Sequence, residues 1–227
     1  MTYIWKNDQD LFALMKEHLF SAVVGDILDQ MGYLHQFIPP QVQPLHPTMV
    51  VVGRAMPVFL QDISANSEPR KFRKPFGLML EALDALKANE VYIATGGSPS
   101  YALWGELMST RAMKLGAAGA VLDGYTRDAD GILSLNFPTF SHGCYAQDQA
   151  PRGEVVDFRI PVTIGEVEIN PGDIIFGDRD GVCIIPQSAE KEAVEQAIEK
   201  AEGENLVRKA IEEGMSACDA FEKFGIM

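Results

Sequence analysis

Hydrophobic residues recur along this chain with two different periods, and the period predicts where helices and strands lie. Residues 8–19 and 23–31 place apolar side chains three or four positions apart, which predicts two helices near the start of the chain. Nearly continuous apolar runs at 49–60 and 90–95 predict strands with both faces buried. Leucines at helical spacing in 75–87 predict a helix between these two strands. This part of the chain is therefore expected to mix helices and strands within one core.

Between Trp104 and Gly131 the sequence predicts a helix, a turn and a buried strand in close succession. Apolar side chains recur at helical spacing from Leu107 to Leu115, and the run Ala120–Leu122 is typical of a short strand. Arg127 and Asp128 follow this strand as an adjacent pair of opposite charges. The pattern thus brings a helix start and a charged pair into one stretch.

This stretch offers three kinds of binding group. The first turn of a helix that begins near Gly105 has N–H groups without intrahelical partners, and these can hold a carboxylate or a phosphate. Arg127 offers a planar guanidinium that matches a carboxylate or an enolate oxygen, and Asp128 offers a hard oxygen ligand for Mg²⁺ or a similar cation. Taken singly, each feature is more often a surface pair or an ordinary helix start. Together they predict a site for a small oxo-acid whose carbonyl is polarised by a metal.

The second half of the chain is predicted to contain short strands and then helices. The expected strands are residues 137–140, 155–164, 166–169, 174–176 and 182–185. From Ser188 a narrow stripe of small apolar residues predicts a long helix, with Gly203 as a candidate interruption and another subunit as a candidate packing partner. Ser216 is expected to cap a last short helix that ends at Gly225.

Composition and charge limit the classes of partner. The chain has 227 residues, which suffices for one domain with helical additions. It carries 19 basic and 32 acidic side chains, a net charge of −13. Such a charge repels nucleic-acid backbones and anionic membranes, so we expect neither as a direct partner.

The cysteines and the apolar segments indicate the compartment. Cys144, Cys183 and Cys218 lie far apart without a CxxC pair, a pattern that indicates free thiols in a reducing environment. No apolar segment approaches the roughly 20 residues that span a bilayer. The start of the sequence lacks the basic and then apolar pattern of a secretory signal. We therefore expect a cytoplasmic protein.

Several other chemistries lack their motifs. Gly96 and Gly97 fit a ligand-binding turn after a strand, but the sequence there matches neither GxGxxG nor GxxxxGKS, which argues against dinucleotide and P-loop sites. Ser98 and Ser100 have no nucleophile-elbow signature, so serine hydrolase chemistry is not expected. His142 has no second ligand at metal-site spacing, which favours a structural role for it.

An ordered set of motifs resembles one protein family. The motifs are GDILDQMG (25–32), VGRAMPV (52–58), GG (96–97), WGEL (104–107), GAAGAVLDGYTRD (116–128), FPTFSHG (137–143) and PGDIIFGDRDGVCIIP (171–186). Their order is similar to that in the family of regulator of RNase E activity A and the pyruvate-producing 4-hydroxy-4-methyl-2-oxoglutarate/4-carboxy-4-hydroxy-2-oxoadipate aldolases. Members have often been labelled demethylmenaquinone methyltransferase, a label now regarded as mistaken. The resemblance covers residues 21–186.

The resemblance implies a fold and an assembly. The fold is an α/β, three-layer β/β/α swivelling-domain fold with flanking N- and C-terminal helices. It would occupy residues 1–186, and residues 187–227 would form a helical extension that packs on the same domain or on a neighbouring subunit. Family members assemble as homotrimers or homohexamers with the site between subunits.

The resemblance also implies roles for particular residues. Arg127 corresponds to the arginine that holds the pyruvyl group, and Asp128 corresponds to the aspartate of a Mg²⁺ or Mn²⁺ site bound largely through water. Backbone N–H groups of Gly105, Glu106 and Leu107 correspond to those that receive the substrate carboxylate. Glu106 stands where the aldolases carry Asp and the RNase regulator carries Gly.

Two departures from the family pattern bear on the metal. Many of the aldolases have an acidic residue three places after the metal aspartate, where this chain has Gly131 beside Asp130. Glu106 is also one methylene longer than the Asp of the aldolases. Both differences bear on metal affinity and on the identity of the substrate.

The expected activity is metal-dependent retro-aldol cleavage of a 4-hydroxy-2-oxo acid without a Schiff base. The metal and Arg127 would stabilise the pyruvate enolate, and a water held near Asp128 and Glu106 would shuttle protons. Oxaloacetate decarboxylation passes through the same enolate and is expected as a side activity. The alternative is a non-catalytic regulator that binds RNase E or another protein. A methyltransferase is disfavoured because no nucleotide-binding glycine motif is present.

Overall fold

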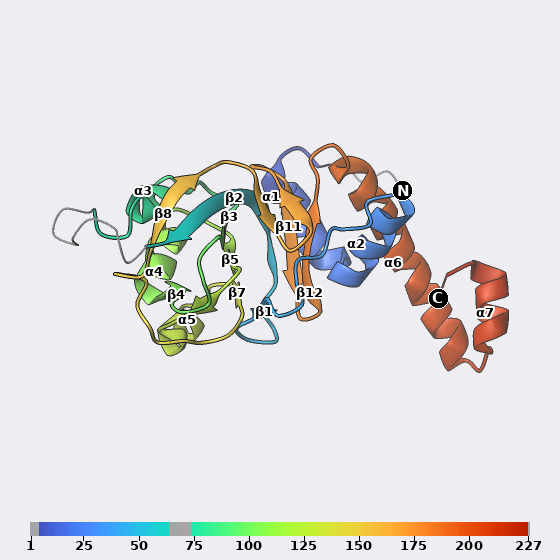
Figure 1. The fold of residues 1–227 in the computed structure, drawn as a ribbon. Helices are drawn as coiled ribbons and strands as arrows, with labels where there is room; N and C mark the ends of the chain where they lie inside the picture. Colours follow the sequence, from blue (N-terminus) through green and yellow to red (C-terminus); the bar gives the residue numbers. More distant parts are fainter. Residues whose placement is uncertain (1–4, 64–73, 227) are drawn as a thin grey trace.

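A curved, mixed β-sheet forms the centre of the protein. The computed structural model describes residues 5–63 and 74–226. Within them eight strands form one sheet in the order β1-β7-β5-β3-β2-β11-β12, with β8 paired to β2 (Figure 1). These strands are β1 (Gln43–Pro44), β2 (Val51–Asp62), β3 (Glu90–Thr95), β5 (Gly119–Leu122), β7 (Thr139–Ser141), β8 (Gly153–Phe158), β11 (Ile174–Asp178) and β12 (Gly181–Ile185).

Strand direction divides this sheet into two parts. The strands β2, β3, β5 and β7 run parallel to one another. β8, β11 and β12 join this parallel part by antiparallel pairing. Two small pairs complete the strands: β9 (Val162–Ile164) with β10 (Val167–Ile169), and β4 (Ala102–Trp104) with β6 (Tyr125–Thr126).

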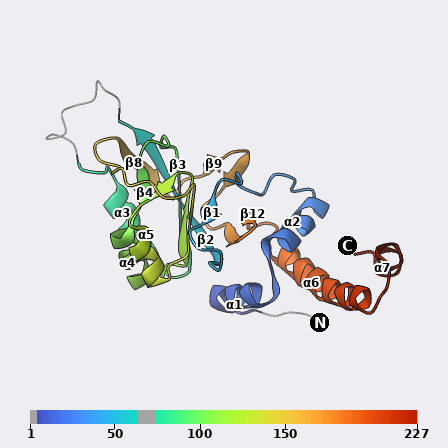
Figure 2. The ribbon, with the colours of Figure 1, turned by 90° about the horizontal axis from the view of Figure 1, so that it is seen from below.

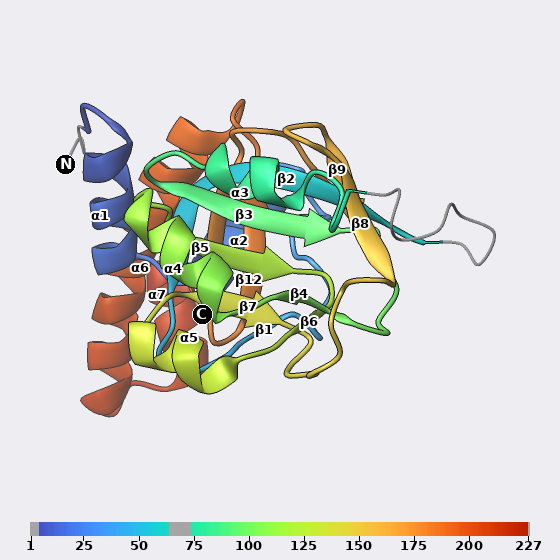
Figure 3. The same ribbon diagram turned by 90° about the vertical axis from the view of Figure 1, so that its left-hand side faces the viewer.

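Helices cover the sheet in two groups. The helices are α1 (Asp8–His18), α2 (Ser21–Gln30), α3 (Met79–Asp84), α4 (Glu106–Lys114), α5 (Ala129–Leu135), α6 (Glu190–Glu212) and α7 (Ala217–Phe224). Helices α3, α4 and α5 lie over β3 and β5 (Figure 3). Helices α1, α2 and α6 lie on the other side of the molecule, next to β12 (Figure 2).

Alternation along the strands explains why this sheet is buried on both faces. On β3, Tyr92 and Ala94 join the core beneath α3 and α4, whereas Val91 and Ile93 join a second core against the β9–β10 hairpin. Side chains of a strand point alternately to its two faces, so a continuous apolar run supplies both cores. The same alternation on β11 and β12 supplies a third core with α1, α2 and α6. Helices, sheet and inner hairpin form layers, which confirms the predicted α/β fold with flanking helices.

Three local differences from the sequence-based prediction have backbone causes. The helix predicted at 75–87 is reduced to α3 because Phe76 and Gly77 have positive φ angles of 64° and 63°. The strand predicted at 155–164 is split by Arg159, whose φ is 59°. Gly203 does not interrupt α6, which runs for 23 residues.

The remaining predictions concern the last helix, membrane-spanning segments, one loop and the domain boundary. The last helix has the expected caps, because the Ser216 side chain accepts a hydrogen bond from the Asp219 N–H and Gly225 adopts a left-handed conformation. Among the described helices, none is long and apolar enough to cross a membrane. The polar and basic sequence of residues 64–75 also predicts an exposed loop, and most of this segment falls outside the described residues. The domain boundary at 186 stays a prediction.

Candidate functional site

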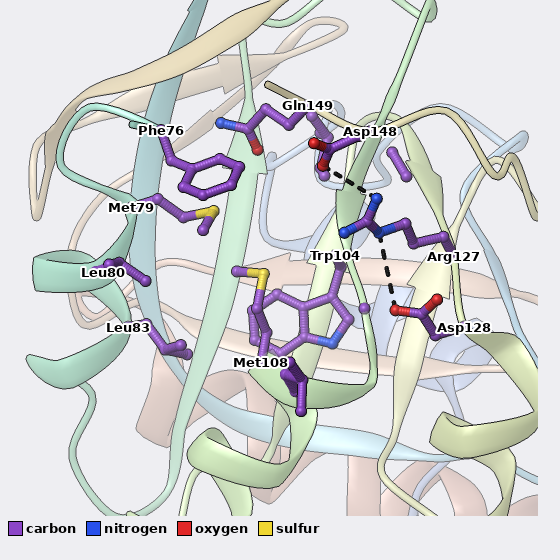
Figure 4. Close-up of a pocket in the computed structure, with 14 residues that line it drawn as sticks. Phe76, Met79, Leu80, Leu83, Trp104, Met108, Arg127, Asp128, Asp148 and Gln149 are labelled. Atoms are coloured by element: carbon purple, nitrogen blue, oxygen red, sulfur yellow. Dashed lines mark ion pairs between the residues drawn. The ribbon is translucent and has the colours of Figure 1, made fainter. Parts of the chain in front are cut away.

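A cavity of about 360 Å³ lies where the start of α4 approaches α3 and the segment after β6 (Figure 4). Small-molecule sites enclose roughly 300–1,000 Å³, so this volume fits a small ligand. Charged side chains of Arg127, Asp128 and Asp148 gather at one end of the cavity, and the Phe76 and Met79 side chains gather at the other. The predicted Gly105 and Leu107 also line it.

Arg127 is held between two carboxylates. Its Nη1 lies 3.0 Å from Asp148 Oδ1, and its Nε lies 3.8 Å from Asp128 Oδ2. Its backbone N–H donates to the Trp104 carbonyl at 2.9 Å, which joins β6 to the strand that leads into α4. The Arg127 side chain remains 38% exposed, so part of its hydrogen-bonding fork can receive a ligand.

Trp104 anchors the start of α4. Its indole Nε1–H donates to Ser109 Oγ at 2.7 Å, and both residues are buried. The first intrahelical bond runs from the Ser109 N–H to the Gly105 carbonyl at 3.1 Å. The N–H groups of the preceding first turn, Glu106 to Met108, therefore have no intrahelical acceptor and can bind an anion.

Gly105 lies close to the Asp128 carboxylate. A Cβ at position 105 would lie 2.7 Å from Asp128 Oδ2, closer than real Cβ atoms come to other atoms. Asp128 itself has left-handed angles (φ 56°, ψ 38°) immediately before α5. This conformation is unfavourable for most side chains but tolerated by Asp. The close approach brings the Asp128 carboxylate to the start of α4.

The Glu106 side chain lies against Gly131 and is not among the residues that line the cavity. A Cβ at position 131 would lie 2.6 Å from Glu106 Cγ. Gly131 belongs to the first turn of α5. Because Gly131 has no side chain, the Glu106 side chain, which is one methylene longer than the Asp of the aldolases, occupies the space beside it. The two departures from the family pattern, at positions 106 and 131, are therefore in direct contact.

Asp148 and Gln149 are functional candidates that sequence reasoning missed. Both lie in the irregular segment between β7 and β8, where no hydrophobic period places them. Gln149 is 3% exposed, and its Nε2 has no hydrogen-bond partner in the described part of the chain. A buried donor without a partner calls for an explanation, and a bound ligand supplies one. The α3 residues that line the cavity, Met79, Leu80 and Leu83, were missed as well, because in the sequence they have the pattern of ordinary core positions of a helix.

The residues present fit a divalent cation held mainly through water. Asp128 presents a carboxylate that is 49% exposed beside the space kept open by Gly105. In the described residues no three His, Cys, Asp or Glu side chains converge as a metal cage. Mg²⁺ commonly binds through one or two carboxylates while keeping several waters. Asp128 is therefore the residue that would hold the ion.

His142 lies outside this cavity. Its Nε2 is 3.2 Å from Asp123 Oδ1, and Asp123 Oδ2 accepts a hydrogen bond from Thr95 Oγ1 at 2.7 Å. Its ring also meets Tyr125 edge-on, with ring centroids 5.9 Å apart. These contacts join the ends of β3, β5 and β7, which suits the structural role expected for it.

The fold and the cavity define a layered α/β protein with a cavity at the start of a helix. The family model described as RraA-like, Aldolase/RraA, matches residues 21–184, and the chain belongs to this family.

Relatives with this sequence pattern carry different names. A protein of Halalkalibacterium halodurans named "Putative 4-hydroxy-4-methyl-2-oxoglutarate aldolase" is 29% identical over 201 residues, which cover 88% of this chain and 89% of that protein. Protein DlpA of Legionella pneumophila is 28% identical over 204 residues, 90% of this chain. The match spans only 32% of DlpA, so this chain corresponds to about a third of that protein.

A solved structure has the same fold. RraAS2 of Streptomyces coelicolor, described as an unusual member of the RNase ES inhibitor RraA protein family, superposes with a TM-score of 0.77. The superposition covers 90% of this chain and 99% of RraAS2 at 22% sequence identity. This likeness supports the fold.

Proposed function

We propose that this protein is a divalent-metal-dependent aldolase that cleaves a 4-hydroxy-2-oxo acid to pyruvate and an oxo compound. The observation that carries the proposal is the position of the Arg127 guanidinium in the cavity at the start of α4, beside the Asp128 carboxylate. The aldolase names of relatives such as the one from Halalkalibacterium halodurans support the same reaction.

In the proposed reaction the first turn of α4 and Arg127 bind the two oxygen-bearing groups of the pyruvyl end. The substrate carboxylate accepts hydrogen bonds from the N–H groups at Gly105–Leu107. Arg127 donates to the 2-oxo oxygen, where negative charge develops. A preorganised donor aimed at developing charge is worth roughly 10²–10³ in rate.

The bond changes balance without a further reactant. The 4-hydroxyl loses its proton as the C3–C4 bond breaks, and C4 becomes the carbonyl of the released oxo compound. The electron pair of the broken bond moves into the C2–C3 bond and gives the pyruvate enolate. A water held near the Asp128 carboxylate carries the proton from the hydroxyl to C3, which completes pyruvate.

A Mg²⁺ or Mn²⁺ ion bound through Asp128 would supply Lewis-acid polarisation of the 2-oxo group. Oxaloacetate should also be decarboxylated, because loss of its carboxylate leaves the same enolate at the pyruvyl end. We further propose that the protein works as a homo-oligomer, a trimer or a hexamer.

The test is pyruvate release from oxaloacetate and from a 4-hydroxy-2-oxo acid, coupled to lactate dehydrogenase, with Mg²⁺ and with EDTA. We expect metal-dependent release that falls at least about 100-fold in Arg127→Ala. Arg111→Ala is the matched control, because Arg111 also lies on α4 but does not line the cavity. Its Nε pairs with Asp84 Oδ1 at a distance of 2.7 Å. Unchanged turnover in Arg127→Ala would refute the proposal.

A non-catalytic regulator that binds RNase E or another protein is the second candidate. The net charge of −13 favours docking onto a basic segment, and RraAS2 is described as a member of an RNase inhibitor family. Capture of purified RNase E, together with no turnover on any of several metals, would favour the regulator.

A further inference from the structure

We propose that the substrate is a monocarboxylic 4-hydroxy-2-oxo acid whose C4 carries a nonpolar alkyl or aryl group. This inference rests on the proposed aldolase function and assigns the substrate class to the same cavity. It differs from a dicarboxylate such as 4-hydroxy-4-methyl-2-oxoglutarate, whose name the Halalkalibacterium halodurans relative carries.

The cavity wall opposite Arg127 is apolar. It is formed by Phe76 and the α3 residues Met79 and Leu83, which face Trp104 and Met108 from the α4 side (Figure 4). Met79, Leu83 and Trp104 are buried, so the wall is part of the core rather than a loose surface patch. A pyruvyl group held at Arg127 would leave this wall for the rest of the substrate. Nonpolar substituents are the groups that such a wall binds.

The described charges of the cavity provide no partner for a carboxylate at the apolar wall. Among the described residues that line it, Arg127 is the single cation, and Asp128 and Asp148 are anions. These described lining residues together carry one net negative charge. A bound divalent cation would change this to one net positive charge, which a single carboxylate neutralises. A second carboxylate placed against the apolar wall would have no cationic partner among the described lining residues, in a confined space where charge–charge energies are larger than in water.

Gln149 provides a neutral donor between the charged end and the apolar wall. Its side chain lies between Phe76 and Asp148 (Figure 4), and its buried Nε2 lacks a partner among the described residues. A neutral amide suits an uncharged oxygen, such as the 4-hydroxyl or the carbonyl that replaces it. It cannot compensate the charge of a carboxylate as a lysine or an arginine would.

Binding of 2-oxo acids tests the inference without turnover. Pyruvate, 2-oxopentanoate, 2-oxohexanoate and 2-oxoglutarate are titrated into the protein by calorimetry in Mg²⁺ buffer. We expect Kd to fall about fourfold for each buried methylene. 2-Oxoglutarate should bind no more tightly than pyruvate. A Kd that is independent of chain length, or tightest for 2-oxoglutarate, would overturn the inference.

Turnover separates this inference from the function on which it rests. Pyruvate release is compared for 4-hydroxy-2-oxoheptanoate, 4-hydroxy-4-methyl-2-oxoglutarate and oxaloacetate. We expect kcat/KM to be at least tenfold higher for 4-hydroxy-2-oxoheptanoate (the heptanoate) than for 4-hydroxy-4-methyl-2-oxoglutarate (the glutarate). Release from the glutarate with equal or higher kcat/KM refutes the substrate class and leaves the aldolase standing. No release from any of the three, including oxaloacetate, refutes the aldolase itself.

A paired substitution tests the location of the nonpolar group. Met108→Lys places an ammonium in the apolar wall and should raise the ratio of glutarate to heptanoate turnover at least tenfold. Met113→Lys is the matched control, because Met113 is an exposed residue of the same helix that does not line the cavity. An equal change of ratio in both variants, or none in Met108→Lys, would show that the nonpolar group does not bind here.

Discussion

Asp128 combines an unfavourable backbone conformation with a position in the candidate site. Its φ of 56° and ψ of 38° lie in the left-handed region, and its side chain accepts no capping hydrogen bond from α5. Such residues persist where the surrounding structure over-determines them, and they are frequent at functional sites. At Asp128 the carboxylate next to Gly105 and Arg127 is the feature that a glycine could not provide.

We therefore expect stability and activity to change in opposite directions in Asp128→Gly. Glycine adopts this conformation without the Cβ penalty, so the free energy of unfolding should rise by up to about 1 kcal/mol. Pyruvate release should fall at least about 100-fold, because the residue proposed to hold the metal is gone. Urea unfolding and the coupled assay measure the two effects. Asp128→Asn is the control, which keeps the conformation, and a fully active Asp128→Gly would contradict the assigned role.

At this scale the sequence predicted only the residues that share a motif. Gly105, Arg127 and Asp128 stand close to a predicted helix start and strand, so local pattern sufficed to group them. Asp148 contacts Arg127 at 3.0 Å but lies in an irregular segment whose path depends on tertiary contacts. The contact between Glu106 and Gly131 likewise does not follow from local pattern, since it joins the first turns of two different helices.

At the scale of elements, Arg54 joins α1, β2 and α6. From β2 its Nη2 and Nε donate to Asp8 at 2.5 and 2.9 Å, and it also pairs with Glu190 at the start of α6. Its guanidinium lies 5.6 Å from the centre of the Phe12 ring. The hydrogen bond from Arg54 holds the pKa of Asp8 below its usual value, despite the opposing effect of partial burial.

This cluster should make the packing of α1 sensitive to acid. A carboxylate with a lowered pKa in the folded protein contributes stability above its unfolded pKa, near 3.8, and loses it as the pH falls through the folded value. Asp8→Asn should therefore lower the free energy of unfolding at pH 7 by roughly 1–2 kcal/mol. The difference from the parent protein should shrink below about pH 4.

Urea unfolding at pH 7, 5 and 3 measures this dependence. Lys191→Gln serves as the control, because it removes an exposed pair with Glu195 that should contribute under about 1 kcal/mol at any pH. A difference between Asp8→Asn and the parent that is equal at pH 7 and pH 3 would mean that Arg54 does not hold the charge of Asp8.

Helices and strands were predicted correctly where the hydrophobic pattern extends over many residues. They were missed where the backbone conformation of a single residue decides where an element begins or ends. The apolar runs of β2 and β3 were recognised because both faces of these strands are buried. Helix α5 was missed because it has seven residues and begins directly after the left-handed Asp128. For the stripe of small residues on α6 the sequence left open packing on this domain or on another subunit, and Ala193, Ala197 and Ala201 pack within this chain against α1 and α2.

At the scale of the whole molecule, the far half of α6 and α7 project away from the sheet (Figure 1). Val207 and Ala220 are buried where the two helices meet. Larger apolar side chains stay exposed on the same helices, with Leu206 at 61% and Phe221 at 57%. Large exposed apolar side chains on a projecting element are compatible with an interaction surface. They support the proposal of a homo-oligomer, with the C-terminal helices as part of its contact.

This proposal predicts that Leu206→Glu combined with Phe221→Glu reduces the assembly to smaller species. Both side chains are exposed, so the charges should change the free energy of unfolding of one subunit by less than about 0.5 kcal/mol. Buried in an interface without partners, the same charges would weaken association strongly. Light scattering after size exclusion measures the molar mass, and Lys209→Glu on the same half of α6 is the control for an added negative charge. An unchanged mass would place the contact elsewhere on the surface.

A reduced mass would let pyruvate release per subunit be measured on the smaller species. Leu107 lines the cavity and is 82% exposed, so a neighbouring subunit has room to contact the site there. Loss of pyruvate release in the smaller species would indicate that such a subunit completes the site.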